Sequence, residues 1–173
     1  SITQGPSSGG TATVDENGDI DYSPPANFNG VDTILYQVCD TGLPVLCDSD
    51  TLFITVTPTN DPPVATDNEY SSVDETATTH SANMVSDDEG NGVDSDPDGD
   101  NLTVTNIDGV TDPNTEVTGT FGSLNWAADG SYTYTLDTND PDYIALADGS
   151  AEADTFTYII SDGNGEFDTA LVI

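Results

Sequence analysis

The stretch Gly122–Leu136, GSLNWAADGSYTYTL, decides the fold of this chain, because it consists of an alternating segment, a turn and a second alternating segment. A related stretch, GTATVDENGDIDYSP, occupies Gly10–Pro24 and aligns with the first without a gap. Alternation places every second side chain on the same face of a β-strand. Asn-Gly and Asp-Gly favour tight hairpin turns because both dipeptides tolerate positive φ angles. Each stretch therefore predicts a β-hairpin with one buried face.

The repeat continues downstream of both hairpins. Asp32–Asp40, DTILYQVCD, matches Asp154–Asp162, DTFTYIISD, and a shorter match aligns Asp50–Ile54 with Asp168–Val172. An internal repeat of this length predicts tandem domains rather than a solenoid, whose units are about 20 to 50 residues long. The proline-rich junction PTNDPP separates the two copies, which predicts one domain over residues 1–61 and a second over residues 62–173.

Short alternating segments with turn signals about every 8 to 12 residues are typical of an antiparallel sandwich. The expected strands of the first unit are Thr11–Val14, Asp19–Ser23, Asp32–Cys39 and Asp50–Thr57. Those of the second are Val64–Ser71, a segment near Ala82–Val85, Asn101–Ile107, Glu116–Trp126, Ser131–Asp137, Asp154–Ser161 and Glu166–Ile173, with one helical turn within Asp140–Leu146. The expected fold is all-β, two tandem antiparallel β-sandwiches, the first incomplete at its N-terminus.

Composition excludes several functions. The chain has 33 acidic residues and neither lysine nor arginine, for a formal net charge of −33. Nucleic acids and anionic membrane surfaces attract cationic side chains, so we expect neither nucleic-acid binding nor membrane insertion. Without a cationic side chain the chain also lacks the usual clamp for phosphate or an oxyanion. No nucleophile elbow or phosphate loop is present, and the single histidine, His80, is expected at the surface. We therefore predict that this is not an enzyme.

Cys39 and Cys47 flank a seven-residue segment between two expected strands. Antiparallel partners at that spacing can meet the short Cα separation that a disulfide requires. The alternatives are two free thiols or a metal site, although a zinc site would need further cysteine or histidine ligands, and none is nearby. We favour the disulfide, which implies an oxidising compartment.

The run Asp94–Asp100, DSDPDGD, alternates carboxylates with serine, proline and glycine. Calcium takes about six to eight oxygen ligands, and a glycine-containing turn helps to gather them around one centre. The run lacks the spaced glutamate of an EF-hand, so that motif is not matched. The alternative interpretation is a solvated acidic loop.

The second unit resembles a VCBS repeat. The matching motifs are VDET from Val73, DSDPDGDNLTV from Asp94, the hairpin DGSYTY from Asp129, the segment Tyr143–Gly149, DTFTY from Asp154 and SDGNG from Ser161. The first unit, with YSP at Tyr22, FNG at Phe28 and the closing NDPP at Asn60, resembles the bacterial cadherin-like tandem repeats that accompany VCBS units.

This resemblance implies a location, a cofactor and partners for the protein. Such arrays occur in large secreted bacterial adhesins and surface proteins, where they have Ig-like or cadherin-like folds and often bind calcium between domains. It implies an extracellular location on a bacterial surface, calcium as the cofactor, and neighbouring repeats of the same chain or fibre as partners. The expected ligands are Asp96 and Asp98 at the junction, joined by Asn60, Asp61 and Glu75, with Asp94 and Asp100 from the same run, Asp40 from the first unit, and its counterpart Asp162 for the next junction.

Three functional hypotheses follow. The first is an extracellular structural or adhesive module that calcium stiffens at its interdomain junction. The second is a carbohydrate-binding module for surface glycans, with Trp126, Tyr132 and Tyr134 as an exposed aromatic platform, although core packing is the commoner role for such rings. The third is the repeating subunit of an extracellular filament, joined by strand addition from a neighbour.

Overall fold

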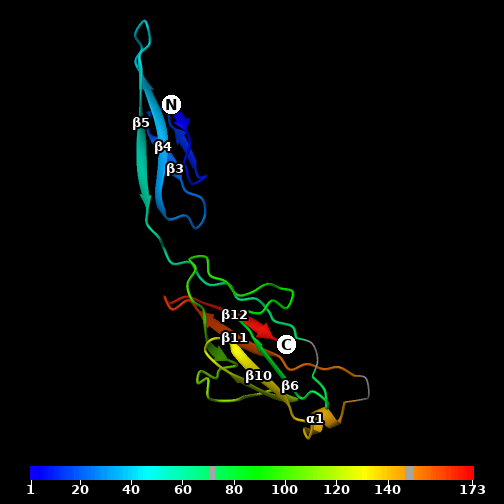
Figure 1. The fold of residues 1–173 in the computed structure, drawn as a ribbon. Helices are drawn as coiled ribbons and strands as arrows, with labels where there is room; N and C mark the ends of the chain where they lie inside the picture. The colour runs from blue at the N-terminus through cyan, green and yellow to red at the C-terminus, as the bar shows by residue number, and fades with distance from the viewer. Residues whose placement is uncertain (71–72, 147–149) are drawn as a thin grey trace. The chain divides into compact units, whose positions relative to one another are not determined.

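The computed structural model describes residues 1–70, 73–146 and 150–173, and it divides into two compact units (Figure 1). Unit 1 is Ser1–Asn60 and unit 2 is Asp61–Ile173. The strands of unit 1 are β1 (Ile2–Gln4), β2 (Thr11–Val14), β3 (Ile20–Ser23), β4 (Gly30–Cys39) and β5 (Cys47–Val56). Unit 2 contains β6 (Thr79–Asn83), β7 (Thr103–Ile107), β8 (Val117–Thr118), β9 (Gly122–Trp126), β10 (Ser131–Leu136), α1 (Pro141–Ile144), β11 (Phe156–Ser161) and β12 (Phe167–Val172).

The predicted all-β fold is confirmed. Unit 2 has two antiparallel sheets, one in the order β6-β10-β9-β8 and the other in the order β12-β11-β7. Their facing side chains form a core of large apolar groups that includes Leu124, Trp126, Tyr158 and Ile160. The short helix α1 lies inside the predicted helical turn. Asp140 caps it, because its carboxylate accepts a hydrogen bond from the Asp142 N–H at 2.7 Å.

Unit 1 is a smaller version of the same arrangement. Its sheet has the order β1-β4-β5, and β2 and β3 form a separate hairpin. Asp32 and Ile34, both on β4, are the only residues of this fully described unit that are buried. Within these 60 residues no strand corresponds to β6 of unit 2. Unit 1 therefore buries far less apolar surface than unit 2.

The repeated hairpins pair as the sequence predicts. Tyr22 lies opposite Ala12 on β2, and its counterpart Tyr134 lies opposite Leu124 on β9. Gly18 and Gly130, at matching turn positions, have φ angles of 93° and 85°, which only glycine adopts readily.

Both units use one hydrogen bond to join the hairpin to the next strand. The Tyr22 hydroxyl donates to Asp32 at 2.8 Å, and the Tyr134 hydroxyl donates to Asp154 at 2.8 Å. Ser7 and Ser8 also donate to Asp32 through their hydroxyls, and Thr33 donates through its backbone N–H. Burial, the largest single influence, raises the pKa of Asp32, but the hydrogen bonds together outweigh it and lower that pKa.

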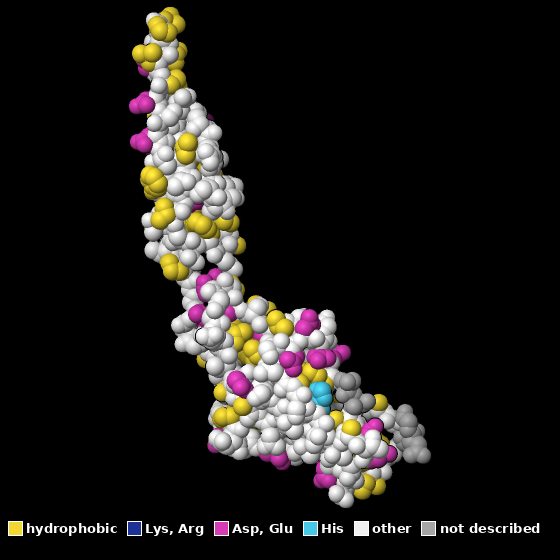
Figure 2. Space-filling model, in the orientation of Figure 1, with side chains coloured by type: hydrophobic (Ala, Val, Ile, Leu, Met, Phe, Trp, Pro, Cys, Tyr) yellow, Lys and Arg dark blue, Asp and Glu magenta, His cyan; other side chains and the backbone are white. Residues whose placement is uncertain are grey.

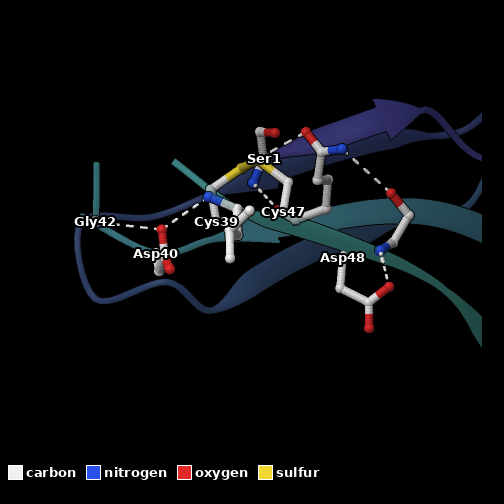
Figure 3. The surroundings of a disulfide bond; sticks show 9 residues. Ser1, Cys39, Asp40, Gly42, Cys47 and Asp48 are labelled. Atoms are coloured by element: carbon white, nitrogen blue, oxygen red, sulfur yellow. Dashed lines mark hydrogen bonds between the residues drawn. A yellow bond between two sulfur atoms is a disulfide. The ribbon is translucent and has the colours of Figure 1, made fainter. Parts of the chain in front are cut away.

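The long β4–β5 hairpin ends in the predicted disulfide. Cys39 and Cys47 lie directly opposite each other at the last pair of the ladder, and their sulfur atoms are bonded (Figure 3). Beyond them Asp40 holds the loop, since its carboxylate accepts hydrogen bonds from the N–H groups of Gly42 and Leu46. The disulfide and the exposed Asp40 carboxylate thus hold the hairpin tip. Leu43, at the end of the tip, is exposed.

Two expectations about strands are wrong, and a third strand begins earlier than expected. The described part of Val64–Ser71 is not a strand but an extended segment with isolated bridges at Val64 and Asn68, and Ser71 lies outside the described residues. Glu116–Trp126 is two strands, because the chain reverses between β8 and β9. The segment near Ala82–Val85 forms its strand earlier, at β6.

The alignment of β5 with β12 also changes. The sequence similarity matched Ile54 of β5 with Val172 of β12. In the structure, Ile34 of β4 pairs with Leu52. Phe156 of β11, the counterpart of Ile34 in the repeat, pairs with Val172. Leu52 is therefore the structural counterpart of Val172. The sequence match implied that the loop before β5 is four residues longer than its counterpart, but the difference is two, since seven residues separate Cys39 from Cys47 and five separate Ser161 from Phe167.

Replacing Ile160 with alanine should destabilise unit 2 by about 2–5 kcal/mol, because Ile160 is fully buried and its loss leaves a cavity in the core. Ile144→Ala is the matched control: Ile144 is 67% exposed, and its replacement should change stability by less than about 0.5 kcal/mol. Denaturant unfolding followed by fluorescence of Trp126, the single tryptophan, reports on unit 2. Equal losses of stability in the two variants would contradict the burial of Ile160 in the core of unit 2.

Asp32→Asn should destabilise unit 1 at neutral pH. The folded-state pKa of Asp32 lies below its unfolded value of about 3.9, so the charged group stabilises the fold above that pH. This contribution is lost as the pH falls through the folded-state pKa, so the variant and the original chain should converge in acid. Hydrogen exchange across residues 1–57 of the intact chain measures this difference in the stability of unit 1. Asp21→Asn, at an exposed position, removes the same charge and should leave the exchange of unit 1 unchanged.

Candidate metal centre

Three carboxylates of one loop in unit 2 lie close together. Asp96, Asp98 and Asp100 each offer an oxygen atom, and these atoms lie within 4.8 Å of one another. The loop between β6 and β7 turns here because the Asp96 carboxylate accepts hydrogen bonds from the N–H groups of Asp98 at 2.8 Å and Asp100 at 3.2 Å. Gly99, with a φ of 82°, completes the reversal. The predicted acidic run thus folds into a cluster.

Two neighbouring segments hold this cluster. The backbone N–H of Asp61, the first residue of unit 2, donates to Asp98 at 2.7 Å. The side-chain amide of Asn164, in the loop between β11 and β12, donates to Asp100 at 2.6 Å. These contacts orient two of the three carboxylates without neutralising them.

The charge of the cluster is suited to a cation. No lysine or arginine exists in the chain to pair with the three carboxylates, and Figure 2 shows acidic side chains over the visible surface of both units. One oxygen of Asp96, Oδ2, is buried and accepts no hydrogen bond from the described residues. Carboxylate oxygens are the ligands that calcium prefers, so the donor set fits this ion.

Asp94 has a different role from the rest of its run. It is only 7% exposed, and it accepts hydrogen bonds from the Thr66 N–H at 2.7 Å and from the buried Tyr158 hydroxyl at 3.0 Å. Burial is the largest influence on this carboxyl group and raises its pKa, while the bonds from Thr66 and Tyr158 act in the opposite direction. Asp94 thus ties the segment after the junction to the core.

Two further predicted ligands of unit 2, Glu75 and Asp162, lie outside this cluster. Glu75 accepts a hydrogen bond from the Tyr143 hydroxyl of α1 at 3.0 Å. Asp162 caps its own loop by accepting from the N–H groups of Asn164, Gly165 and Glu166. Asp40 caps the hairpin tip of unit 1 as described above. Asn60 is the last residue of unit 1.

The aromatic side chains do not form the exposed platform that carbohydrate binding would need. Trp126 is 5% exposed and Tyr132 is 4% exposed, because their positions on β9 and β10 face the core. Tyr132 and Tyr134 line a partly open pocket of about 280 Å³ together with Asp154. His80, expected at the surface, packs beside the rings of Tyr70 and Tyr132 with its own ring half-buried.

Two contributors to the cluster were missed in the sequence. Asn164 belongs to a loop that matches the family pattern, but the sequence does not show that this loop lies beside Asp100. The backbone of Asp61 was also missed, since only its side chain was considered. The pairing of β7 with β11 brings the loop of Asp100 and the loop of Asn164 to the same end of the sandwich. A single sequence carries no direct signal for that contact.

Comparisons with known proteins match both units. A family described as bacterial cadherin-like domain matches residues 60–173, and one described as bacterial Ig domain matches residues 1–57. The comparison with curated proteins gave no match. A solved endo-fucoidan hydrolase from glycoside hydrolase family 107 aligns with 17% identity and a TM-score of 0.34, over 99% of this chain but 28% of that one. Among the described residues, no helix is both long and apolar enough to cross a membrane.

Proposed function

Because residues 60–173 place this chain in the bacterial cadherin-like domain family, we propose that it is an extracellular structural and adhesive module of a bacterial surface protein or fibre. Tandem domains of the cadherin-like and Ig kinds are typically structural modules. The adjoining match to a bacterial Ig domain supports a repeat array, in which neighbouring repeats are the partners. The Cys39–Cys47 disulfide supports an oxidising compartment outside the cytoplasm.

Calcium is the proposed cofactor. The observation that carries this proposal is the cluster of Asp96, Asp98 and Asp100, whose carboxylates converge with no cationic side chain to balance them. Asp98 is hydrogen-bonded to the first residue of unit 2, so an ion held by the cluster is coupled to the junction sequence. We propose that the bound ion removes repulsion at this point and stiffens the junction, with Asn60 and the Asp61 side chain as further ligands.

A second candidate function is supported by a separate observation. Sheet β1-β4-β5 of unit 1 ends at β5, and no described strand pairs with the other edge of β5. An open edge can accept an extended segment from another molecule. This favours joining of molecules into a filament by strand addition. The buried positions of Trp126 and Tyr132 remove the surface on which the carbohydrate-binding hypothesis depended.

Asp98→Asn should weaken calcium binding by about tenfold or more, because it removes a charged oxygen donor from the cluster. Asp88→Asn removes the same charge from an exposed loop that lies outside the cluster, and it should leave the affinity unchanged. Isothermal titration calorimetry of the intact chain measures both. Identical affinities for the two variants would show that calcium does not bind at the cluster.

Calcium should raise the melting temperature more than sodium chloride or magnesium chloride at the same ionic strength. Monovalent salt screens repulsion among the 33 acidic residues, whereas a bound ion acts where carboxylates converge. Small-angle scattering should also show a more flexible chain in chelator than in calcium. Coincident melting curves in the three salts would leave screening as the whole effect, and identical scattering profiles would remove the mechanical role of calcium.

A further inference from the structure

We propose that the opening segment of unit 2, residues 64–70, and strand β12 form a parallel clamp that resists a force pulling the two ends of the unit apart. This inference rests on the proposed function, in which neighbouring repeats pass force along the array. It deepens that function because it names the residues that resist the force. The calcium cluster has no part in it.

The opening segment and β12 run in the same direction. Asn68 forms a parallel bridge with Val172. The Asn68 N–H donates to the Leu171 carbonyl at 2.8 Å, and the Ile173 N–H donates to the Asn68 carbonyl at 2.9 Å. The Tyr70 N–H continues the row by donating to the Ile173 carbonyl at 3.1 Å. These are the backbone bonds of a parallel ladder.

Two carboxylates extend this row, one from each side of the clamp. Asp67 of the opening segment accepts a hydrogen bond from the Leu171 N–H at 2.9 Å. Asp168 of β12 accepts one from the Ala65 N–H at 2.8 Å. Hydrogen bonds to charged acceptors are stronger than those between neutral groups. The clamp therefore reaches from Ala65 to Tyr70, well beyond the single bridge at Asn68.

The direction of the two strands decides how a force acts on these bonds. Unit 1 ends at Asn60, so a force from unit 1 reaches unit 2 at Asp61 and pulls the opening segment toward its N-terminal end. A force on Ile173 pulls β12 toward its C-terminal end. Because the strands are parallel, these pulls slide one strand along the other and strain every bond between them at once. Strands pulled apart from the same end would instead separate bond by bond.

Asn68 pins the opening segment inside the sandwich. Its side chain is 1% exposed, and its amide donates to the Met84 carbonyl at 2.9 Å and to the Tyr158 hydroxyl at 3.1 Å. Nearby, the Thr66 N–H donates to the buried carboxylate of Asp94 at 2.7 Å. Sliding the segment breaks these bonds and leaves buried polar groups without partners, which is costly. The pinned side chain therefore opposes the first step of sliding.

The opening segment is the more weakly attached side of the clamp. β12 pairs with β11 along its whole length, from Phe167 opposite Ser161 to Val172 opposite Phe156. Among the described strands, only β12 lies beside the opening segment, and Val64 adds a single bridge outside the strands. Under force, the opening segment should therefore separate from β12 before β12 separates from β11.

The test holds the intact chain at constant force in optical tweezers, attached at Ser1 and at Ile173. In a second preparation, an azide-bearing residue replaces Glu166, which is exposed and precedes β12, and the second attachment is made there. Force at that position pulls on the end of β12 where force also enters the opening segment, so the bonds separate one after another. Unit 2 should stay folded about tenfold longer or more when it is pulled from Ile173.

The length of released chain identifies the unit that unfolds. Each unfolded residue extends by up to about 3.5 Å, and unit 2, Asp61–Ile173, is longer than unit 1, Ser1–Asn60. Equal lifetimes of unit 2 in the two directions of pulling would overturn the inference.

Asp67→Ala removes one bond of the clamp and should raise the unfolding rate of unit 2, pulled from Ile173, by about fivefold or more. Glu69→Ala is the matched control, because it removes the same charge from an exposed position of the same segment, and it should leave the rate unchanged. Equal rates for the two variants would also overturn the inference. A chelator is present throughout, so these outcomes judge the clamp alone, whereas calorimetry of Asp98→Asn judges the calcium proposal.

Discussion

Every carboxylate that turns inward in this chain must be held by neutral donors, because there is no lysine or arginine to pair with it. Burying an unpaired charge is costly, so the fold depends on supplying N–H and O–H groups at each such position. Asp32 receives them from serine, tyrosine and the backbone, and Asp154 receives them from Tyr134 and the N–H groups of Thr120 and Phe121. Both sites join the central hairpin to the following strand, which explains why the aspartate and the tyrosine recur together in the two repeats.

The same chemistry shapes the loops. A carboxylate that accepts the N–H two residues later stabilises a turn, and aspartate is the residue suited to this because its side chain is short. The aspartates that do so are Asp15, Asp40, Asp74, Asp88, Asp96, Asp112, Asp129, Asp137, Asp140 and Asp162. Much of the acidity is therefore structural. In the cluster of Asp96, Asp98 and Asp100, the turn made by Asp96 also brings the other two carboxylates beside it, so one local hydrogen-bonding pattern yields both a turn and a group of converging charges.

The sequence predicts what depends on local pattern and fails where distant segments decide the outcome. The two hairpins, the disulfide and the helical turn follow from alternation, turn residues and spacing, and all are present. The sequence match placed the counterpart of Val172 two residues too late on β5, because it overestimated the difference in length between the loops before β5 and β12. Trp126 is buried because its strand faces the second sheet, while alternation shows only that it shares a face with its neighbours. Glu75 lies beside Tyr143 instead of the acidic cluster, a contact between residues far apart in sequence.

The two units also show how much of a sandwich its opening segment contributes. In unit 2, Asn68 bonds to Tyr158 and Met84, and Thr66 bonds to Asp94, so one extended segment satisfies the polar groups between the sheets. That arrangement lets Tyr158 be fully buried, whereas Tyr36 remains half-buried in unit 1. In unit 1 a covalent link and the Asp32 network both act on β4. Since both features act on β4, the central strand of the order β1-β4-β5, they stabilise the sheet of unit 1 from within.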